Sequence, residues 1–346
     1  MPTPPLEIRA SNVETLLQQL DSESARVGTR EMHLDLSRVS RIERLAGGLL
    51  SNALMGSLGE GPLTVDLDEH STDWLWTSGL AFAIANRLGE TEIIGSGSSE
   101  DVSELRAWRQ SWRPGMEVTW REMLTATQSQ LFAPPSIGET EAIPDLFGPT
   151  FAAFVDPHLN RSDASGAHPI ATVIWPWLDR LLPGPSRQSG ARHRYISEVG
   201  RFITETVANV SEHAAGSGYP CRSLAQVSIT SGGDGRRLYL SVQDTGPGIA
   251  TTARPKLDSA EQELVGTDED LLRMLLSGRL RPWGRSRGLG LPFIARIAKS
   301  RGGKMFVATR RSRLSQDSSH GMTASSSDFD LTGTVVAIML PIPREF

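Results

Sequence analysis

The amino-acid sequence predicts a mixed α/β protein, of the α/β or α+β class, with two domains. The chain has 346 residues, of which 38% are hydrophobic, and one hydrophobic core usually serves about 100–200 residues. Short apolar runs alternate with helical patterns over residues 32–95, which is typical of β-α-β units. We therefore expect a small α/β domain over 1–125, an irregular connector with a short helix over 126–189, and a C-terminal domain over 190–346.

The N-terminal domain is predicted to contain strands separated by helices. Each expected strand is a short apolar run, and the segments between them carry apolar residues at helical spacing. The strands are expected at 32–36, 62–67 and 91–95, and the helices at 47–58 and 71–88.

The C-terminal domain begins with a long amphipathic helix over 194–215, where valine and isoleucine recur at three- and four-residue steps. The Gly-rich turn 231–235 then joins two strand-like runs. A polar, Ser-rich segment over 312–330 predicts a flexible hairpin insertion. The remaining elements are expected in the order strand 225–230, strand 236–244, mobile stretch 250–287, helix 289–300, strand 304–309 and strand 333–342.

Residues 133–170 in the connector are rich in Pro, Gly and Asp and show no sustained period. We expect them to be irregular, followed by a short helix over 170–182.

The composition argues against several classes of function. The 35 basic and 40 acidic residues give a net charge of −5, which argues against a general nucleic-acid-binding surface. The single cysteine, Cys221, excludes an internal disulfide framework and a cysteine-cluster metal site. The first residues lack the pattern of a signal peptide, and no run of 18 apolar residues predicts a membrane span. We expect a cytoplasmic protein without a membrane partner.

The first candidate motif lies on the long helix. Glu205, Asn209 and His213 follow one another at steps of four and so share one stripe, turned away from the apolar residues. Polar helix positions are most often plain solvated surface, so this stripe alone does not establish a site.

The second motif, Asp244-Thr-Gly246-Pro-Gly248-Ile249, directly follows a predicted strand. A carboxylate at a strand end accepts hydrogen bonds and so suits an amine donor. The glycines permit backbone torsions or close approaches that a side chain would forbid. A plain turn explains the same string.

The third motif runs from Gly284 into a helix. Glycines at a helix start expose backbone N–H groups, and the helix dipole favours an anion there. The spacing fits neither a Walker loop nor a dinucleotide fingerprint. The residues of interest are Arg285, Arg287, Gly288, Leu289 and Gly290.

The order E-x-x-x-N-x-x-x-H, then D-x-G-x-G-I, then G-L-G-L resembles the GHKL, or Bergerat-fold, ATPases, which include DNA gyrase, heat-shock chaperones, histidine kinases and MutL. The resemblance covers residues 190–343 and includes the closing segment GTVVAIMLPIP. It implies a Bergerat α/β sandwich that binds ATP and Mg²⁺.

The resemblance also implies a role for each matching residue. Asn209 corresponds to the Mg²⁺-binding asparagine and Glu205 to the acid that polarises a water or hydroxyl nucleophile. Asp244 corresponds to the adenine-binding aspartate. The base pocket would be shaped by Gly246, Gly248 and Ile249, and the phosphate-side turn by Gly288, Leu289 and Gly290.

Two features of the motifs leave alternatives open. His213 fits the longer motif of anti-sigma-factor serine kinases, and in this chain it either contacts phosphate or packs against the turn. Ser286 stands where the family usually has a glycine. Arg285 and Arg287 beside it supply charge to the terminal phosphate or are solvated residues of a lid.

Residues 33–50, HLDLSRVSRIERLAGGLL, resemble the STAS domains of anti-sigma-factor antagonists. In that family a phosphorylated serine follows an acid; here Glu43 takes the acid position, but Arg44 and Leu45 replace the serines. The resemblance, over about 30–95, implies a docking or regulatory domain rather than a phosphoacceptor. A generic small α/β domain is the alternative.

These observations predict a bacterial-type signalling protein. ATP would bind against the Glu205–Asn209 helix under a lid formed by residues 250–287, and its γ-phosphate would pass to water or to a protein partner. Whether the protein forms a homodimer is left open by the sequence. The alternative is a non-catalytic, nucleotide-gated interaction module. A histidine kinase is disfavoured because no phosphoacceptor helix precedes Glu205, and a gyrase-like machine because no transducer domain follows.

Overall fold

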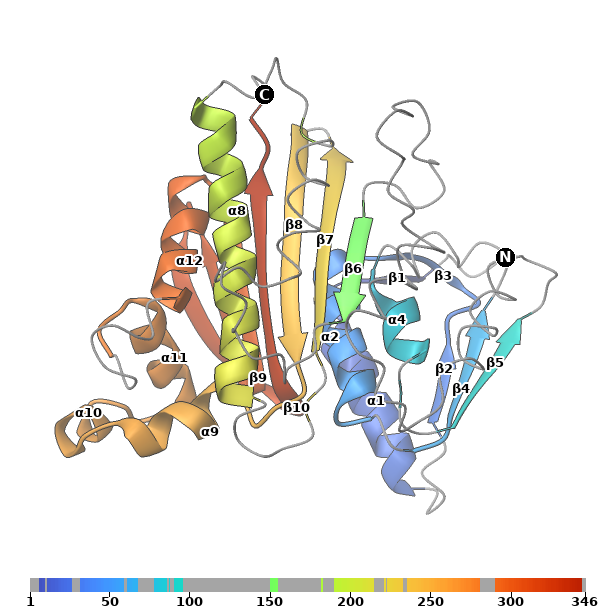
Figure 1. Ribbon diagram of the computed structural model, residues 1–346. Coiled ribbons are helices and arrows are strands. Elements are labelled where there is room, and N and C mark those ends of the chain that lie inside the picture. Colours follow the sequence, from blue (N-terminus) through green and yellow to red (C-terminus); the bar gives the residue numbers. More distant parts are fainter. Residues whose placement is uncertain are drawn as a thin grey trace.

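The computed structural model describes residues 6–9, 11–26, 32–58, 61–67, 78–85, 87, 90–95, 150–154, 182, 190–214, 221, 223–232, 235–280 and 290–343. These residues form two α/β units that lie side by side (Figure 1).

The N-terminal unit is built on parallel strands, which pair in the order β2-β4-β5, with β1 and β3 as a separate parallel pair. Its elements are β1 (Leu6–Ile8), α1 (Val13–Arg26), β2 (Met32–Asp35), β3 (Val39–Ile42), α2 (Arg44–Met55), β4 (Leu63–Leu67), α4 (Leu80–Ala85) and β5 (Thr91–Gly95). This confirms the three predicted strands and the helix predicted over 47–58. Of the helix predicted over 71–88, residues 80–85 are helical and 71–77 lie outside the described residues.

The C-terminal unit contains a five-stranded sheet with the order β6-β7-β8-β10-β9, in which every neighbouring pair is antiparallel. The strands are β6 (Thr150–Phe154), β7 (Ser223–Gly232), β8 (Gly235–Asp244), β9 (Lys304–Asp317) and β10 (Gly321–Pro341). The helices are α8 (Gly190–Asn209), η2 (Val210–Ala214), α9 (Ile249–Ala253), η4 (Arg254–Lys256), α10 (Ser259–Glu263), α11 (Asp268–Leu276) and α12 (Gly290–Ser300). The predicted long helix, the strands 225–230 and 236–244, and the helix near 289–300 are confirmed.

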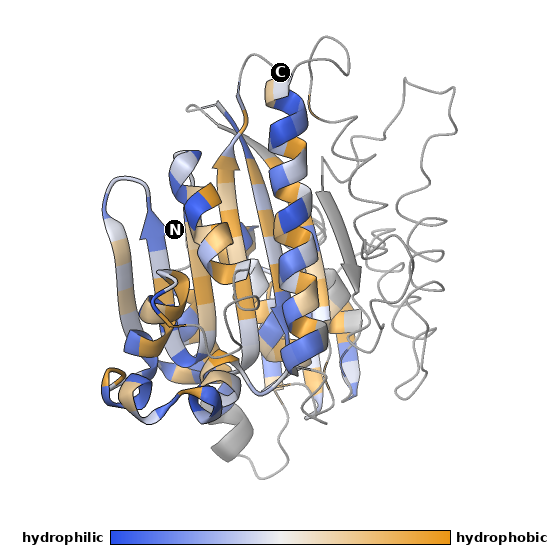
Figure 2. Cartoon of the chain, turned by 60° about the vertical axis from the view of Figure 1, so that its left-hand side comes forward, coloured by the Kyte–Doolittle hydropathy of each residue, from blue (hydrophilic) through white to orange (hydrophobic). Residues whose placement is uncertain are grey.

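One face of this sheet is covered by helices. Alternate residues along β7 and β8, such as Val227, Leu240 and Val242, form a common core with Phe202 and Val207 of α8. Figure 2 shows the hydrophobic strands behind α8, whose outward side carries hydrophilic residues. The period of two in the strands and of about 3.6 in the helix explains how each element buries one side.

The opposite face of the sheet is covered by the N-terminal unit. Leu224 of β7, Ala308 of β9 and Val335 of β10 share a core with Leu50 and Leu54 of α2. The sheet is therefore enclosed between the helical layer and the N-terminal unit, and it is in contact with both.

Two segments, one expected to be irregular and one expected to be a flexible hairpin, are paired strands. Part of the predicted connector, Thr150–Phe154, pairs with β7 as an edge strand, although its hydrogen bonds come from residues far away in the sequence. The flexible hairpin predicted over 312–330 is a hairpin of paired strands, in which Gly321 pairs with Asp317 and the Ser315 and Thr323 hydroxyls lie 2.7 Å apart; its pairing shifts register between Ser326 and Leu331. Cross-strand pairing stabilises such polar strands without any apolar period. The predicted helix over 170–182 lies outside the described residues, apart from Leu182.

The expected mobile stretch is largely helical. Capping boxes begin α10 at Asp258 and α11 at Thr267, where each side chain accepts a hydrogen bond from the backbone N–H three residues later. These helices enclose a small core that includes Ala253, Leu271 and Leu280. Residues 281–289 lie outside the described residues.

Among the residues that the structure describes, no helix combines the length and the hydrophobicity needed to cross a membrane.

Candidate functional site

The end of α8 supplies one wall of a cavity. Asn209 lies at the last position of α8, and His213 lies in the π-helical turn that continues it. Both residues line the cavity, together with Thr206 and Val210. A π-helical turn within a longer helix is frequently found at functional sites.

The second motif supplies the facing wall. Asp244, Gly248 and Ile249 line the same cavity as Asn209. The structure therefore brings together the asparagine of the first motif and the aspartate of the second, which are separated by a whole β-hairpin in the sequence. The rest of the lining is mainly apolar and includes Val242, Leu275, Leu291 and Val336.

Asp244 is a buried acid at the end of β8. Asp244 is 8% exposed, and its Oδ1 accepts a hydrogen bond of 2.9 Å from the backbone N–H of Gly246. Burial raises the pKa of Asp244 to about 7, and the Gly246 hydrogen bond opposes this rise. A ligand that donates a hydrogen bond would compensate the carboxylate for its lost hydration.

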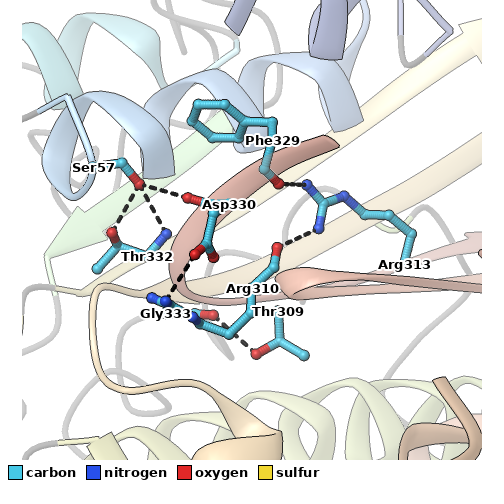
Figure 3. Close-up of polar contacts among 8 residues, drawn as sticks. All are labelled: Ser57, Thr309, Arg310, Arg313, Phe329, Asp330, Thr332 and Gly333. Atoms are coloured by element: carbon cyan, nitrogen blue, oxygen red, sulfur yellow. Dashed lines mark hydrogen bonds and ion pairs between the residues drawn. The ribbon is translucent and has the colours of Figure 1, made fainter. Parts of the chain in front are cut away.

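Gly248 must be a glycine for two reasons. Its φ is +89°, and a Cβ there would lie 2.7 Å from Thr309 Oγ1. The Thr309 hydroxyl accepts a hydrogen bond from the Ile249 N–H and donates one to the Gly333 carbonyl, each of 3.0 Å. Thr309 thereby fastens the Asp244 loop to β9 and β10. Figure 3 shows its hydrogen bond to Gly333.

Gly333 is a second glycine that the site requires, and sequence reasoning missed it. Its φ is +86°, and a Cβ there would fall 1.9 Å from the carbonyl oxygen of Asp244. This close approach places Thr334 opposite Asp244 in the pairing of β10 with β8, and Thr334 lines the cavity. The Gly-Thr pair at the start of the predicted last strand was the available signal.

The third motif meets the first through Gly290. A Cβ on Gly290 would lie 3.0 Å from Glu205 Oε2 and 3.5 Å from Asn209 Nδ2, so the start of α12 packs directly against α8. Glu205 thus lies beside the cavity, with its Oε1 3.6 Å from Arg201 Nε. The Arg201 guanidinium in turn lies 3.7 Å above the Phe293 ring centre. The other predicted residues of this motif, Arg285, Arg287, Gly288 and Leu289, lie outside the described residues.

The described residues contain no cluster of three or more His, Cys, Asp or Glu side chains that could hold a metal ion. In the cavity, the side-chain amide oxygen of Asn209 could join oxygens of a bound ligand in holding a divalent cation. That donor set fits Mg²⁺, which is usually held by few protein oxygens alongside substrate phosphates.

Comparison with protein families gives one match. The family described as "Histidine kinase-, DNA gyrase B-, and HSP90-like ATPase" matches residues 196–344, which includes Asn209, Asp244 and Gly290. Residues 196–344 are a GHKL ATPase domain. The predicted family and its α/β sandwich fold are confirmed. No curated protein matches the chain.

The match supports ATP binding by this domain and a function of the signalling ATPase or kinase type. Domains of the family bind ATP, generally together with Mg²⁺. The match begins at residue 196 and leaves out the N-terminal unit, whose resemblance to STAS domains stays a prediction.

We predict that Gly248→Ala destabilises the domain more than a matched glycine substitution. Gly321 has a similar φ of +78°, but a Cβ there would have nothing within 4 Å. Gly321→Ala should lower the free energy of unfolding by about 1–2 kcal/mol because of its backbone conformation. Gly248→Ala should cost a further 1–3 kcal/mol or so because its Cβ meets Thr309. Urea unfolding measures both; equal losses would contradict the assigned contact.

Proposed function

We propose that the chain binds Mg²⁺-ATP in the cavity between α8 and the Asp244 loop, and either hydrolyses it or transfers its γ-phosphate to a protein partner. The observation that carries this proposal is that Asn209 and Asp244, from two separate motifs, line one cavity. The GHKL match over residues 196–344 supports the choice of ligand.

The Asp244 end of the cavity would hold the adenine ring. The buried carboxylate would accept a hydrogen bond from the exocyclic amine, and the apolar side chains of Ile249, Leu275 and Val336 would cover the ring faces. Gly246 supports this role by holding Asp244 Oδ1, and Gly248 by allowing the loop to turn beneath Thr309.

The Asn209 end would hold the triphosphate. Asn209 would contribute an oxygen to Mg²⁺, His213 would lie beside the phosphates, and the N–H groups at the start of α12 would face their negative charge. We assign Gly288, Leu289 and Gly290 to the turn that faces the phosphates. We assign Arg285 and Arg287 to a contact with the terminal phosphate.

Glu205 would act as the general base. It lies one helical turn before Asn209, and the contact with Gly290 places its carboxylate at the start of α12. Either reaction needs an oxygen nucleophile aligned with the γ-phosphate, and a nearby carboxylate can orient it and accept its proton. Arg201 supports this position from the preceding turn.

The remaining segments would regulate the reaction. We propose that residues 250–287 form a lid over the nucleotide, and that nucleotide binding changes the surface that this lid offers to a protein partner. The N-terminal unit would be a STAS-like docking domain, since Arg44 and Leu45 supply no hydroxyl for phosphotransfer. A homodimer is compatible with this arrangement.

A non-catalytic, nucleotide-gated interaction module is the second candidate. It is favoured by Ser286, which replaces the glycine expected in the third motif. The glutamate at 205 favours turnover instead.

The binding proposal is tested by titrating wild type, Asn209→Ala and Asp244→Asn with ATP, with and without Mg²⁺, by calorimetry and thermal shift. Removing one buried hydrogen-bond partner costs about 1–3 kcal/mol, so Asp244→Asn should weaken ATP binding about 5- to 150-fold. Asn209→Ala should abolish the gain in affinity from Mg²⁺. Wild type that gains no thermal stability from any adenine nucleotide would overturn the proposal.

Binding should also depend on pH through Asp244. Because its pKa lies at about 7 in the free protein, a carboxylate that accepts the adenine amine must lose its proton on binding below that pH. Affinity for adenosine, which does not titrate in this range, should therefore rise from about pH 6 to 8, by at most about tenfold per unit. Asp244→Asn should show a flat profile; a wild-type profile that is equally flat would contradict the assignment.

Glu205→Gln separates the two candidate functions. If Glu205 is the general base, its replacement should lower kcat about 10²- to 10⁴-fold and leave the Kd for ATP within about twofold. Arg201→Gln is the matched control, because it removes the neighbouring charge and leaves the carboxylate in place. Equal, near-zero turnover by wild type and Glu205→Gln with retained ATP binding would favour the interaction module.

A further inference from the structure

The N-terminal unit contacts the nucleotide site from behind. Helix α2 packs against β8 and β10 on the face of the sheet opposite α8. Asn52 of α2 is fully buried, and its Nδ2 donates a hydrogen bond of 2.7 Å to the backbone carbonyl of Asp244. The side chain of this same aspartate lines the cavity. One residue of the ATPase domain is thus held by the N-terminal unit on one side and faces the ligand cavity on the other.

The contact falls at a crowded point of the sheet. Gly333 lies over the same carbonyl, where a Cβ would approach to 1.9 Å, and the pairing of β10 with β9 shifts register between Leu331 and Thr334. A small displacement of the Asp244 backbone would therefore meet β10 and would be transmitted to the carboxylate.

The end of α2 is fastened beside this point. The Ser57 hydroxyl lies within 3.1 Å of the Asp330 carbonyl oxygen and accepts a hydrogen bond of 3.0 Å from the Thr332 N–H (Figure 3). A Cβ on Gly56 would lie 2.9 Å from Thr332 Cβ. The helix end thus holds a fixed position on β10, and Asn52 is presented to Asp244 from a rigid support.

Stability alone does not account for an asparagine at this position. Within the described part of the chain its Oδ1 has no hydrogen-bond partner, and a buried, unsatisfied amide oxygen is costly. The neighbouring buried positions of α2 are Ser51 and the apolar residues Leu50, Ala53 and Leu54. A buried amide whose only paired atom, among the described residues, is the one that holds Asp244 points to a role in function.

We propose that Asn52 is a positioning residue of the nucleotide site: it fixes the backbone of Asp244 and so couples docking of the N-terminal unit to adenine binding. This inference rests on the proposed function. Because coupling between two binding events is reciprocal, nucleotide must stabilise the docked N-terminal unit by the same factor by which docking strengthens nucleotide binding.

The test compares Asn52→Ala with Tyr239→Phe. The Tyr239 hydroxyl of β8 donates a hydrogen bond of 3.3 Å to the Arg44 carbonyl of α2. Tyr239→Phe therefore removes a contact between the same two elements without touching Asp244. Both variants should lower the melting temperature. Only Asn52→Ala should raise the Kd for Mg²⁺-ATP, by about tenfold or more. Asn52→Leu, which fills the space without a donor, carries the same test if Asn52→Ala does not fold.

Hydrogen exchange supplies the reciprocal measurement. Mg²⁺-ATP should slow amide exchange in α2 of the wild type and of Tyr239→Phe, but not in Asn52→Leu. Unchanged ATP affinity in the Asn52 variants, or equal weakening in Tyr239→Phe, would overturn the inference while leaving the proposed function intact. Failure of the wild type to bind ATP would overturn both.

Discussion

The burial of one carboxylate, that of Asp244, is the constraint on which the site depends. The end of β8 buries this carboxylate, and burial raises its pKa to about 7. The surrounding residues compensate in part: Gly246 donates to the side chain, and Thr309 and Gly333 hold the loop that carries it. Among the described residues, Gly246 donates a hydrogen bond to this acid in a largely apolar cavity, and such an acid suits a ligand that brings a donor of its own.

The five-stranded sheet connects the Asp244 site to both units of the chain. Its helical face carries Asn209 and the cavity, whereas its other face carries α2 and the N-terminal unit. β8 belongs to both contacts, because the side chain and the backbone of Asp244 point to different partners. The family match covers the residues of the first face; on the second face, Asn52 of the N-terminal unit contacts the Asp244 carbonyl.

The parts of the site predicted from the sequence are those with local signals. The four-residue spacing of Glu205 and Asn209 and the glycines after Asp244 required only short-range geometry, and the structure brings Asn209 and Asp244 together. Thr309, Gly333 and Asn52 were missed because each acts through a contact with a residue far away in the sequence. The strand β6 was missed for the same reason, since its pairing with β7 leaves no periodic pattern of its own.

The central claim is that the Asp244 carboxylate recognises an amine on the purine. The most direct measurement compares the affinities of the wild type for Mg²⁺-ATP and Mg²⁺-GTP by calorimetry. Guanine presents a carbonyl oxygen where adenine presents its amine, so the two acceptors would face each other. The account predicts that ATP binds about tenfold tighter or more. Equal affinities, or tighter binding of GTP, would contradict it.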